Sequence, residues 1–227
     1  MPVISFVSSK GGVGKTTSAL LLALGLAERG LAVSLVDSDP NQPLQAWSAL
    51  PGKPDLIGLF HAPQFDDLPG ELRRAQRAAE MVIVDTEGGA PRMGGLAVAH
   101  ATLVITPLAA SALEAREALK VAELVARVSR REGRSIPLVG VFARTPAGAR
   151  RSFRDISADL DAAGLAMLST VLSDREAFRA LFRSGGAVGA LDRRRVSGVS
   201  AAAAVVTAFT DEVIATLRDV DPKFKVG

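Results

Sequence analysis

The chain has 227 residues, of which 48% are hydrophobic and 22% charged, so it is long and apolar enough to bury one sizeable core. It contains no cysteine, which excludes disulfides, zinc–thiolate sites, iron–sulfur clusters and a cysteine nucleophile, and suits a cytoplasmic protein. The net charge of +3 is uneven: residues 1–120 carry 10 basic and 12 acidic side chains, and residues 121–227 carry 17 and 12. The basic excess therefore lies in the C-terminal half, as a patch for nucleic acid or for acidic lipid would.

Short apolar runs alternate with longer helical patterns, which predicts βαβ units and one α/β domain over residues 1–227, with a doubly wound, mainly parallel sheet flanked by helices. The strands are expected at Val3–Val7, Val33–Asp37, Leu56–Phe60, Met81–Asp85, Ala101–Thr106, Ile136–Ala143 and Ala166–Val171. The helices are expected at Thr16–Arg29, Asn41–Ala49, Leu68–Ala79, Ser111–Arg131, Arg150–Ala163, Asp174–Ser184 and Ser200–Val220.

A glycine-rich run directly follows the first predicted strand, and a helical pattern begins at once. It reads Ser9-Lys10-Gly11-Gly12-Val13-Gly14-Lys15-Thr16. This is the context of the phosphate-binding loop of P-loop NTPases, in which backbone N–H groups surround phosphates, Lys15 supplies a point charge and the Thr16 hydroxyl binds magnesium. A turn that binds nothing is the alternative, disfavoured because clustered glycines cost stability. Ser9 stands where the motif usually has its first glycine, and Lys10 is a second lysine inside the loop.

The segment Lys10–Thr17 resembles the deviant phosphate loop of the ParA/MinD family of partitioning ATPases, and the resemblance covers most of the chain. Val36–Pro40 looks like the family's second carboxylate motif, and Val82–Thr86 looks like its magnesium-side strand. Two further segments, Asn41–Trp47 and Asp85–Gly89, resemble a narrower branch that includes the VirC-type ATPase of T-DNA transfer.

The resemblance implies a binding site for ATP and Mg²⁺. The nucleotide would be held by Lys10, Gly11, Gly12, Val13, Gly14, Lys15, Thr16 and Thr17. Lys10 would reach the phosphates of a partner subunit, Lys15 those of its own nucleotide, and Asp39 would position the attacking water. Thr16, Asp37 and Asp85 would serve the metal. For Asp37 and Asp39 helix capping is the alternative, because both precede Pro40 and a polar turn.

The implied activity is slow, partner-stimulated ATP hydrolysis by a cytoplasmic, nucleoid-associated protein. The implied partners are a second copy bound face to face with ATP, non-specific double-stranded DNA, and an adaptor or cargo protein. A second hypothesis is a nucleotide-gated recruitment factor for a DNA-transfer complex, in which hydrolysis is incidental. Many relatives read adenine with an asparagine after the sixth strand, where this chain has Phe142–Pro146.

Three arginine groups in the C-terminal half are candidates for DNA contact. They are Arg150, Arg151 and Arg154; Arg175, Arg179 and Arg183; and Arg193, Arg194 and Arg195. The i, i+4, i+8 spacing of the second group predicts one helical face suited to a duplex backbone. The alternative is a solvated face balanced by acidic neighbours such as Asp155, Asp174, Glu176 and Asp192.

The remaining signals are weaker. The stripe Val205, Phe209, Val213 and Leu217 predicts core packing rather than a membrane anchor, and no membrane partner is expected. Trp47 is expected to pack in the core, with a contact to a partner subunit left open. Four glycines would let the segment after Asp85 respond to a γ-phosphate, unless it is only a flexible surface loop. They are Gly88, Gly89, Gly94 and Gly95.

Overall fold

The structure is a computed structural model that describes residues 1–145, 150–222 and 224, with the backbone alone for residues 150–152. Its strands are β1 (Val3–Phe6), β2 (Val33–Ser38), β3 (Ile57–His61), β4 (Met81–Thr86), β5 (Leu103–Leu108), β6 (Leu138–Ala143) and β7 (Ala166–Leu172). Its helices are α1 (Lys15–Ala27), α2 (Pro43–Ser48), α3 (Leu68–Ala78), α4 (Pro91–His100), α5 (Ala112–Glu132), α6 (Arg150–Ala162), α7 (Glu176–Ser184) and α8 (Val199–Val220), with a short 3₁₀ turn η1 (Val188–Ala190).

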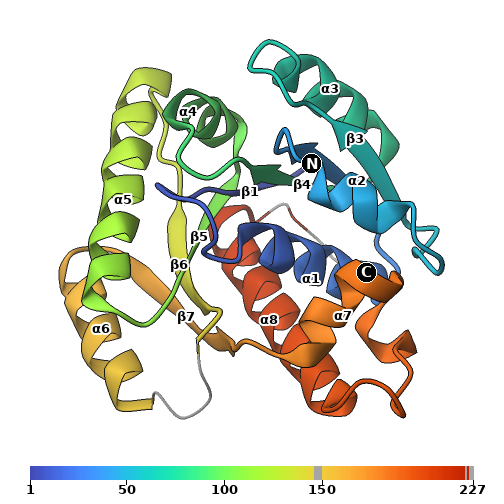
Figure 1. Cartoon of the computed structure of the whole chain (residues 1–227). Helices are drawn as coiled ribbons and strands as arrows, with labels where there is room; N and C mark the ends of the chain where they lie inside the picture. The colour runs from blue at the N-terminus through green and yellow to red at the C-terminus, as the bar shows by residue number, and fades with distance from the viewer. Residues whose placement is uncertain (146–149, 223, 225–227) are drawn as a thin grey trace.

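The strands form one seven-stranded sheet in the order β3-β2-β4-β1-β5-β6-β7, and every pairing between neighbours is parallel (Figure 1). β1 lies at the centre, between β4 and β5. Because strand order runs in opposite directions on the two sides of β1, the crevice at its carboxyl end is where such sheets bind ligands. The predicted doubly wound parallel sheet is confirmed, and all seven strands lie within two residues of their expected bounds.

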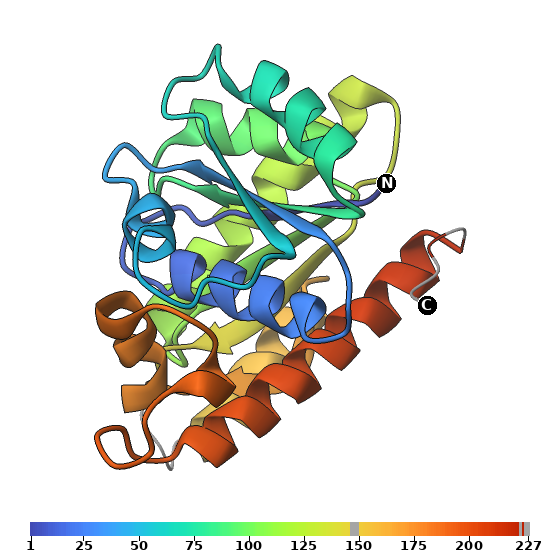
Figure 2. The same cartoon turned by 90° about the vertical axis from the view of Figure 1, so that its right-hand side faces the viewer.

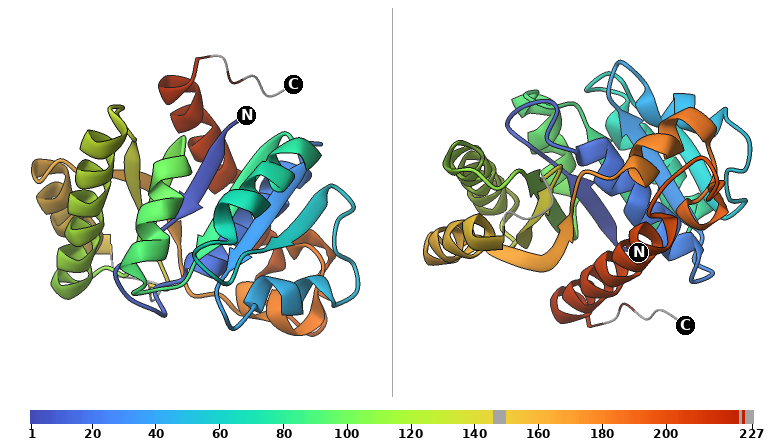
Figure 3. Two further views of the ribbon diagram at one scale, coloured as in Figure 1. Left: turned by 90° about the horizontal axis from the view of Figure 1, so that it is seen from above. Right: turned by 60° about the horizontal axis from the view of Figure 1, so that its bottom comes forward.

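Helices cover both faces of the sheet. α1, α7 and α8 pack on one face against Ile4, Phe6, Ile83 and other residues that point the same way (Figure 2). On the opposite face α3 and α4 pack against Val82 and Val84, and α4, α5 and α6 continue the layer over the other half of the sheet. Figure 3 (left) shows α5, α4 and α3 in a row on that face.

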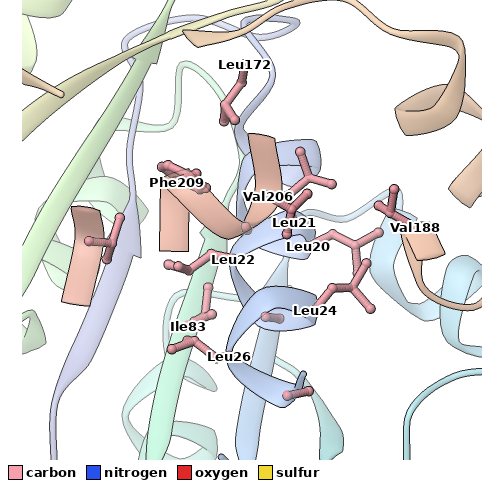
Figure 4. Close-up of a cluster of buried hydrophobic side chains, with 14 of the residues drawn as sticks. Leu20, Leu21, Leu22, Leu24, Leu26, Ile83, Leu172, Val188, Val206 and Phe209 are labelled. Carbon is pink, nitrogen blue, oxygen red and sulfur yellow. The ribbon is translucent and has the colours of Figure 1, made fainter. Parts of the chain in front are cut away.

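α1 forms the centre of the largest hydrophobic cluster, whose close-up is Figure 4. Leu20, Leu21, Leu22, Leu24 and Leu26 are all fully buried, because the helix is apolar on every side and α8 covers the side that the sheet does not. Burying each such leucine contributes roughly 1.5–3 kcal/mol. The first helix is thus firmly fixed, and its N-terminus, where the glycine-rich loop ends, is fixed with it.

α4 was not predicted, and the expected freedom of Gly94 and Gly95 is wrong because both lie inside this helix. Pro91 at the start of the helix favours its first turn. A Cβ at Gly94 would lie 3.2 Å from Val7 Cγ1, so the missing side chain lets α4 approach β1 closely. Only Gly88 and Gly89 remain in the connecting segment.

α8 is the one helix in the described part of the chain that is long and apolar enough to cross a membrane, with a mean hydropathy of 1.4. Core helices meet the same criterion. Here Phe209, Val213 and Leu217 of the predicted stripe are buried in the cluster around α1, and Val205 packs against this cluster while partly buried, which is the core packing predicted for the stripe. Lys223 and Lys225, beyond the helix, lie outside the described residues.

Candidate functional site

The glycine-rich loop connects the end of β1 to the N-terminus of α1, at the centre of the sheet's carboxyl edge. Gly12 and Gly14 have φ angles of 78° and 100°, a region that disfavours other residues, so both glycines are needed for the loop's path. Gly14 is also the N-cap of α1. The free N–H groups and the positive end of the α1 dipole therefore face the crevice, which makes the loop suited to an anion.

Lys15 is the buried cation of the loop. Its Nζ donates to Ser8 Oγ at 2.9 Å, and Ser8 Oγ in turn donates to the Lys10 carbonyl at 2.6 Å. Burial lowers the pKa of Lys15, and the nearby charges of Asp85, Asp39 and Glu87 oppose this shift. The ammonium group is thus placed among carboxylates, with capacity left to bind phosphate oxygens.

Asp85 ends β4 beside β1 and is fully buried. Neither of its carboxylate oxygens has a hydrogen-bond partner among the described residues. Burial raises the pKa of Asp85 to about 7, while the neighbouring Thr16 hydroxyl and Lys15 act in the opposite direction. A buried carboxylate without a partner is costly unless a cation neutralises it, so the site fits a magnesium ion held between Asp85 and Thr16.

No group of three or more histidine or acidic side chains in the described ranges could hold a metal by itself. Magnesium differs from zinc in this respect, because it is usually bound by one or two protein oxygens together with water and substrate phosphates. The arrangement of Asp85 and Thr16 next to a phosphate-binding loop therefore fits a site for magnesium bound together with a nucleotide. It does not fit a metal site formed by protein side chains alone.

Asp37 lies near the end of β2 and Asp39 directly follows the strand, and their carboxylates make different hydrogen bonds. Asp37 is buried and accepts the backbone N–H of Asp39 at 3.1 Å, of Leu44 at 2.9 Å and of Gln45 at 3.3 Å. Burial raises the pKa of Asp37, and these hydrogen bonds oppose the shift. Asp37 thus caps α2, the alternative considered from the sequence, and its service to a metal stays a prediction.

Asp39 is half-buried and lines the crevice in front of the loop. Its Oδ1 accepts the backbone N–H of Asn41 at 2.8 Å and the Asn41 side-chain amide at 3.0 Å. These bonds close a tight turn, and the second carboxylate oxygen, Oδ2, has no hydrogen-bond partner among the described residues. The position agrees with a carboxylate that orients water, which stays a prediction.

Gly88 presses the segment after β4 against the loop. A Cβ built at Gly88 would lie 2.5 Å from Gly11 Cα and 2.6 Å from the Lys10 carbonyl oxygen. Gly89, with a φ of 80°, donates its N–H to the Ser8 carbonyl at 3.4 Å. The pair of glycines therefore joins the segment to the loop backbone, and both would have to move together.

Two side chains at the start of the loop are tied to α5, and we call these two contacts the α5 tether. Lys10 forms an ion pair with Glu114 of the same chain. Ser9 Oγ donates to Glu117 Oε2 at 2.8 Å. The serine that replaces the motif's first glycine therefore links the loop to α5. Lys10 therefore has an intramolecular partner in a single protomer.

The loop lines one side of a crevice of about 390 Å³ that also includes Thr17, Asp39 and Gly88. The opposite wall comes from the end of β7 and from α7, with Leu172, Ser173, Asp174, Phe178, Arg179 and Phe182. Arg144 lines it as well. This wall could not be predicted from the sequence, because its residues come from segments more than 120 positions away from the loop.

Arg175, Arg179 and Arg183, which were predicted to share one face of a helix, do not form one regular face. α7 begins at Glu176, because Arg175 has extended backbone, and Arg175 is its N-cap with a buried Nε that lacks a partner in the described residues. Arg179 lines the crevice and pairs with Asp174 at 2.6 Å and with Glu176 at 3.2 Å. Arg183 pairs with Glu176 as well. The acidic neighbours considered from the sequence thus partly balance this group.

Among the other candidates, Arg154 is exposed on α6, and Arg193, Arg194 and Arg195 are exposed in the loop before α8. The side chains of Arg150 and Arg151 lie outside the described residues, as does Pro146 of the stretch expected to meet the base.

Trp47 is 1% exposed and donates from Nε1 to the Gly186 carbonyl at 3.3 Å. It packs within its own chain, against the loop that follows α7.

The phosphate loop follows the central strand of a parallel sheet, and it lies beside a buried lysine and an unpaired carboxylate. Together these features define a P-loop nucleotide-binding protein. The model of the VirC1 protein family matches residues 1–220, and the chain belongs to this family. The chain is also 33% identical over 187 residues to the protein ParA of Rhizobium radiobacter, covering 82% of this chain and 84% of that one. The predicted membership of the ParA/MinD family, with its VirC-like features, is confirmed.

Two further proteins extend the comparison. The protein virC1 of Rhizobium rhizogenes is 28% identical over 190 residues, covering 82% of each chain. The septum site-determining protein MinD of Pyrococcus horikoshii, solved in complex with Mg-ADP, superimposes with a TM-score of 0.69 at 18% identity over 93% of this chain and 95% of that one. The latter similarity shows a shared fold.

Proposed function

We propose that the chain is an ATP-driven switch that binds Mg-ATP in this crevice, closes into a homodimer, binds double-stranded DNA non-specifically and releases it after slow hydrolysis. An adaptor or cargo protein would stimulate hydrolysis, so that plasmid or chromosomal DNA, or a large protein cluster, is segregated or positioned. The observation that carries the proposal is the unpaired, buried carboxylate of Asp85 beside Lys15 and Thr16. Family membership and the Mg-ADP complex of a protein of the same fold support it.

Each residue of the site has a distinct part in this proposal. Lys15 and the loop N–H groups bind the phosphates, and Asp85 and Thr16 hold the metal. Magnesium, when bound, neutralises phosphate charge that would otherwise resist attack by water. Asp39 orients that water from the mouth of the crevice, and Asp37 keeps the segment in place by capping α2.

Lys15→Ala tests the phosphate loop, and binding of Mg-ATP is measured by isothermal titration calorimetry. We expect loss of measurable binding, because no second buried cation replaces Lys15 in the described part of the loop. Lys53→Ala is a matched control, since Lys53 lies in the loop before β3 and bonds to the Ile57 carbonyl at 2.6 Å. Unchanged affinity of Lys15→Ala for ATP would refute the assignment of the loop.

Lys10 can serve a partner subunit only if it leaves Glu114. Dimer formation would then exchange an intramolecular ion pair for a contact with the partner's nucleotide, which makes dimerisation depend on ATP. Lys10→Ala should bind ATP as a monomer in sedimentation experiments, whereas Glu114→Gln should dimerise at lower ATP concentration than the wild type. Lys120→Ala is the control, because Lys120 pairs with Glu117 on the same helix. A Lys10→Ala protein that still sediments as a dimer with ATP would contradict the proposed role.

DNA binding is proposed on the basic excess of residues 121–227 and on exposed arginines such as Arg154. The candidates are Arg150, Arg151, Arg154, Arg175, Arg179 and Arg183. Because Arg179 lines the crevice, its replacement also changes the nucleotide site, and Arg150→Ala/Arg151→Ala/Arg154→Ala is the cleaner variant. Fluorescence anisotropy with a duplex of arbitrary sequence should show weaker binding and a shallower salt dependence. Wild-type affinity in this triple variant would remove these three residues from the proposed surface.

We propose as a second candidate function a nucleotide-gated recruitment factor for a DNA-transfer complex, in which hydrolysis is incidental; membership of the VirC1 family is compatible with both functions. Asp39→Ala separates the two. A switch that needs hydrolysis should be trapped as a DNA-bound dimer and lose cargo movement, while a recruitment factor should keep its function. We also propose that the protein is cytoplasmic and associated with the nucleoid, has no membrane partner, and can be followed as a fluorescent fusion beside stained DNA.

A further inference from the structure

Arg144 has an unusual backbone conformation directly after β6. Its φ is 52°, and Gln42 is the only other non-glycine residue with a positive φ in the described ranges. The Arg144 N–H donates to the Leu172 carbonyl at 2.9 Å, and the Asp174 N–H donates to the Thr145 carbonyl at 3.2 Å. The ends of β6 and β7 are thus held together, and this turn is maintained in spite of the cost that a left-handed conformation has for an arginine.

The result of this turn is that the Arg144 side chain lies across the phosphate loop. Its Nη1 donates to the Gly12 carbonyl. A Cβ built at Gly14 would lie 3.3 Å from the Arg144 Cγ and 3.6 Å from its Cδ. The aliphatic part of the arginine therefore covers Gly14, and the guanidinium lies at Gly12, where the loop has no side chains to obstruct it.

We propose that Arg144 is a nucleotide-positioning residue that fixes the Gly12 peptide and binds the phosphate chain of the nucleotide from the same subunit. This inference rests on the proposed nucleotide site. A guanidinium has five N–H donors, and the bond to Gly12 uses one of them, so donors remain for phosphate oxygens. Arg144 lines the same crevice as Lys15 and Thr16, which puts its charge on the side of the loop where phosphates would bind.

The charges around the crevice support this role. Lys15 is close to the carboxylates of Asp85 and Asp39 and is partly neutralised by them. Arg179, the other arginine of the crevice wall, pairs with Asp174 and Glu176. Arg144 bonds to a neutral carbonyl instead, so its positive charge is available to an anion.

Arg144→Gly is the decisive variant, because glycine accepts the left-handed backbone without strain. A residue that only stabilised the fold would lose thermal stability and nucleotide affinity in parallel. We expect a melting temperature equal to or above that of the wild type together with a 10- to 100-fold weaker Kd for Mg-ADP, about the effect of one charge-assisted hydrogen bond. Arg144→Lys, which keeps the charge and loses the planar fork, should lie between the two. Arg77→Ala, at an exposed arginine of α3, is the control for a lost surface charge.

The two probes are Mg-ADP and inorganic tripolyphosphate with Mg²⁺, titrated calorimetrically into each protein. Tripolyphosphate lacks base and ribose, so a similar loss for both probes supports a contact with the phosphate chain. A loss restricted to Mg-ADP, or an unchanged Kd for both probes in Arg144→Gly, would overturn the inference. If the wild type binds neither probe, the proposed nucleotide site fails and this inference with it. If the wild type, Arg77→Ala and Arg144→Gly all bind alike, only the role of Arg144 fails.

Discussion

Replacing Asp85 by asparagine tests the idea that this buried carboxylate is electrostatically strained when no cation neutralises it. Asp85 is completely buried, and both of its carboxylate oxygens lack partners among the described residues. Its pKa is raised from 3.8 to about 7 by burial. An asparagine has nearly the same shape and no charge, so Asp85→Asn removes the titration and keeps the packing.

The sign of the effect follows from the direction of the shift. Because the folded pKa of Asp85 is raised, stability is fully present below the unfolded pKa of 3.8 and is lost as the pH rises to about 7. Each unit in this interval costs about 1.4 kcal/mol, so the wild type should lose about 3 kcal/mol between pH 5 and pH 8 relative to Asp85→Asn. The comparison uses the difference between two proteins, in which the titration of all other groups largely cancels.

Urea unfolding at pH 5, 6, 7 and 8, without nucleotide and with a chelator, measures this difference. Asp55→Asn, at an exposed aspartate before β3, is the matched control and should follow the wild type at every pH. Mg-ATP at pH 8 should stabilise the wild type and leave Asp85→Asn almost unchanged. Parallel stability curves for wild type and Asp85→Asn from pH 5 to pH 8 would refute the reasoning.

Two glycine substitutions test close contacts of the fold. Gly88→Ala should weaken Mg-ATP binding at least 10-fold in calorimetry, because the new Cβ would lie 2.5 Å from Gly11 Cα. Gly70→Ala is the control and should bind Mg-ATP like the wild type, because Gly70 in α3 has open space around it. Equal affinities of Gly88→Ala and the wild type would show that the loop can move aside. Gly25→Ala should lower the free energy of unfolding by about 1–3 kcal/mol, since its Cβ would lie 2.0 Å from Thr210 Oγ1. Adding Thr210→Ala should restore part of the loss in thermal melting, and no recovery would contradict the contact.

The phosphate loop and the parallel sheet could be predicted because their signals are local. Gly12, Gly14, Lys15 and Thr16 lie within five positions, directly between a strand and a helix. Periodicity likewise predicted the seven strands, since each is apolar over most of its length. The missed helix α4 is the converse case: a proline and two glycines are typical of loops, and only packing against Val7 shows why glycine is required there.

Contacts between distant segments account for the rest. The spacing of Arg175, Arg179 and Arg183 describes a helix, but it does not show that Arg179 faces the crevice or that Glu176 pairs with two of its neighbours. Nothing near Arg144 in the sequence indicates that its side chain lies on a loop 130 positions earlier. Such residues are found only when the strand order brings their elements to one edge of the sheet.

The two walls of the crevice are mechanically joined through α2. At one end of this helix, Asp37 accepts the Leu44 N–H at 2.9 Å, which ties α2 to the turn that carries Asp39. At the other end, Trp47 is buried and donates to the Gly186 carbonyl after α7, and α7 supplies the far wall of the crevice. The Asp39 turn and the loop after α7 are therefore joined by contacts of the same short helix. Because packed cores tend to switch between discrete arrangements, we expect a nucleotide that reorders Asp39 to displace α7 and its arginines as well. This provides a physical route by which occupation of the phosphate loop changes a surface proposed to contact DNA.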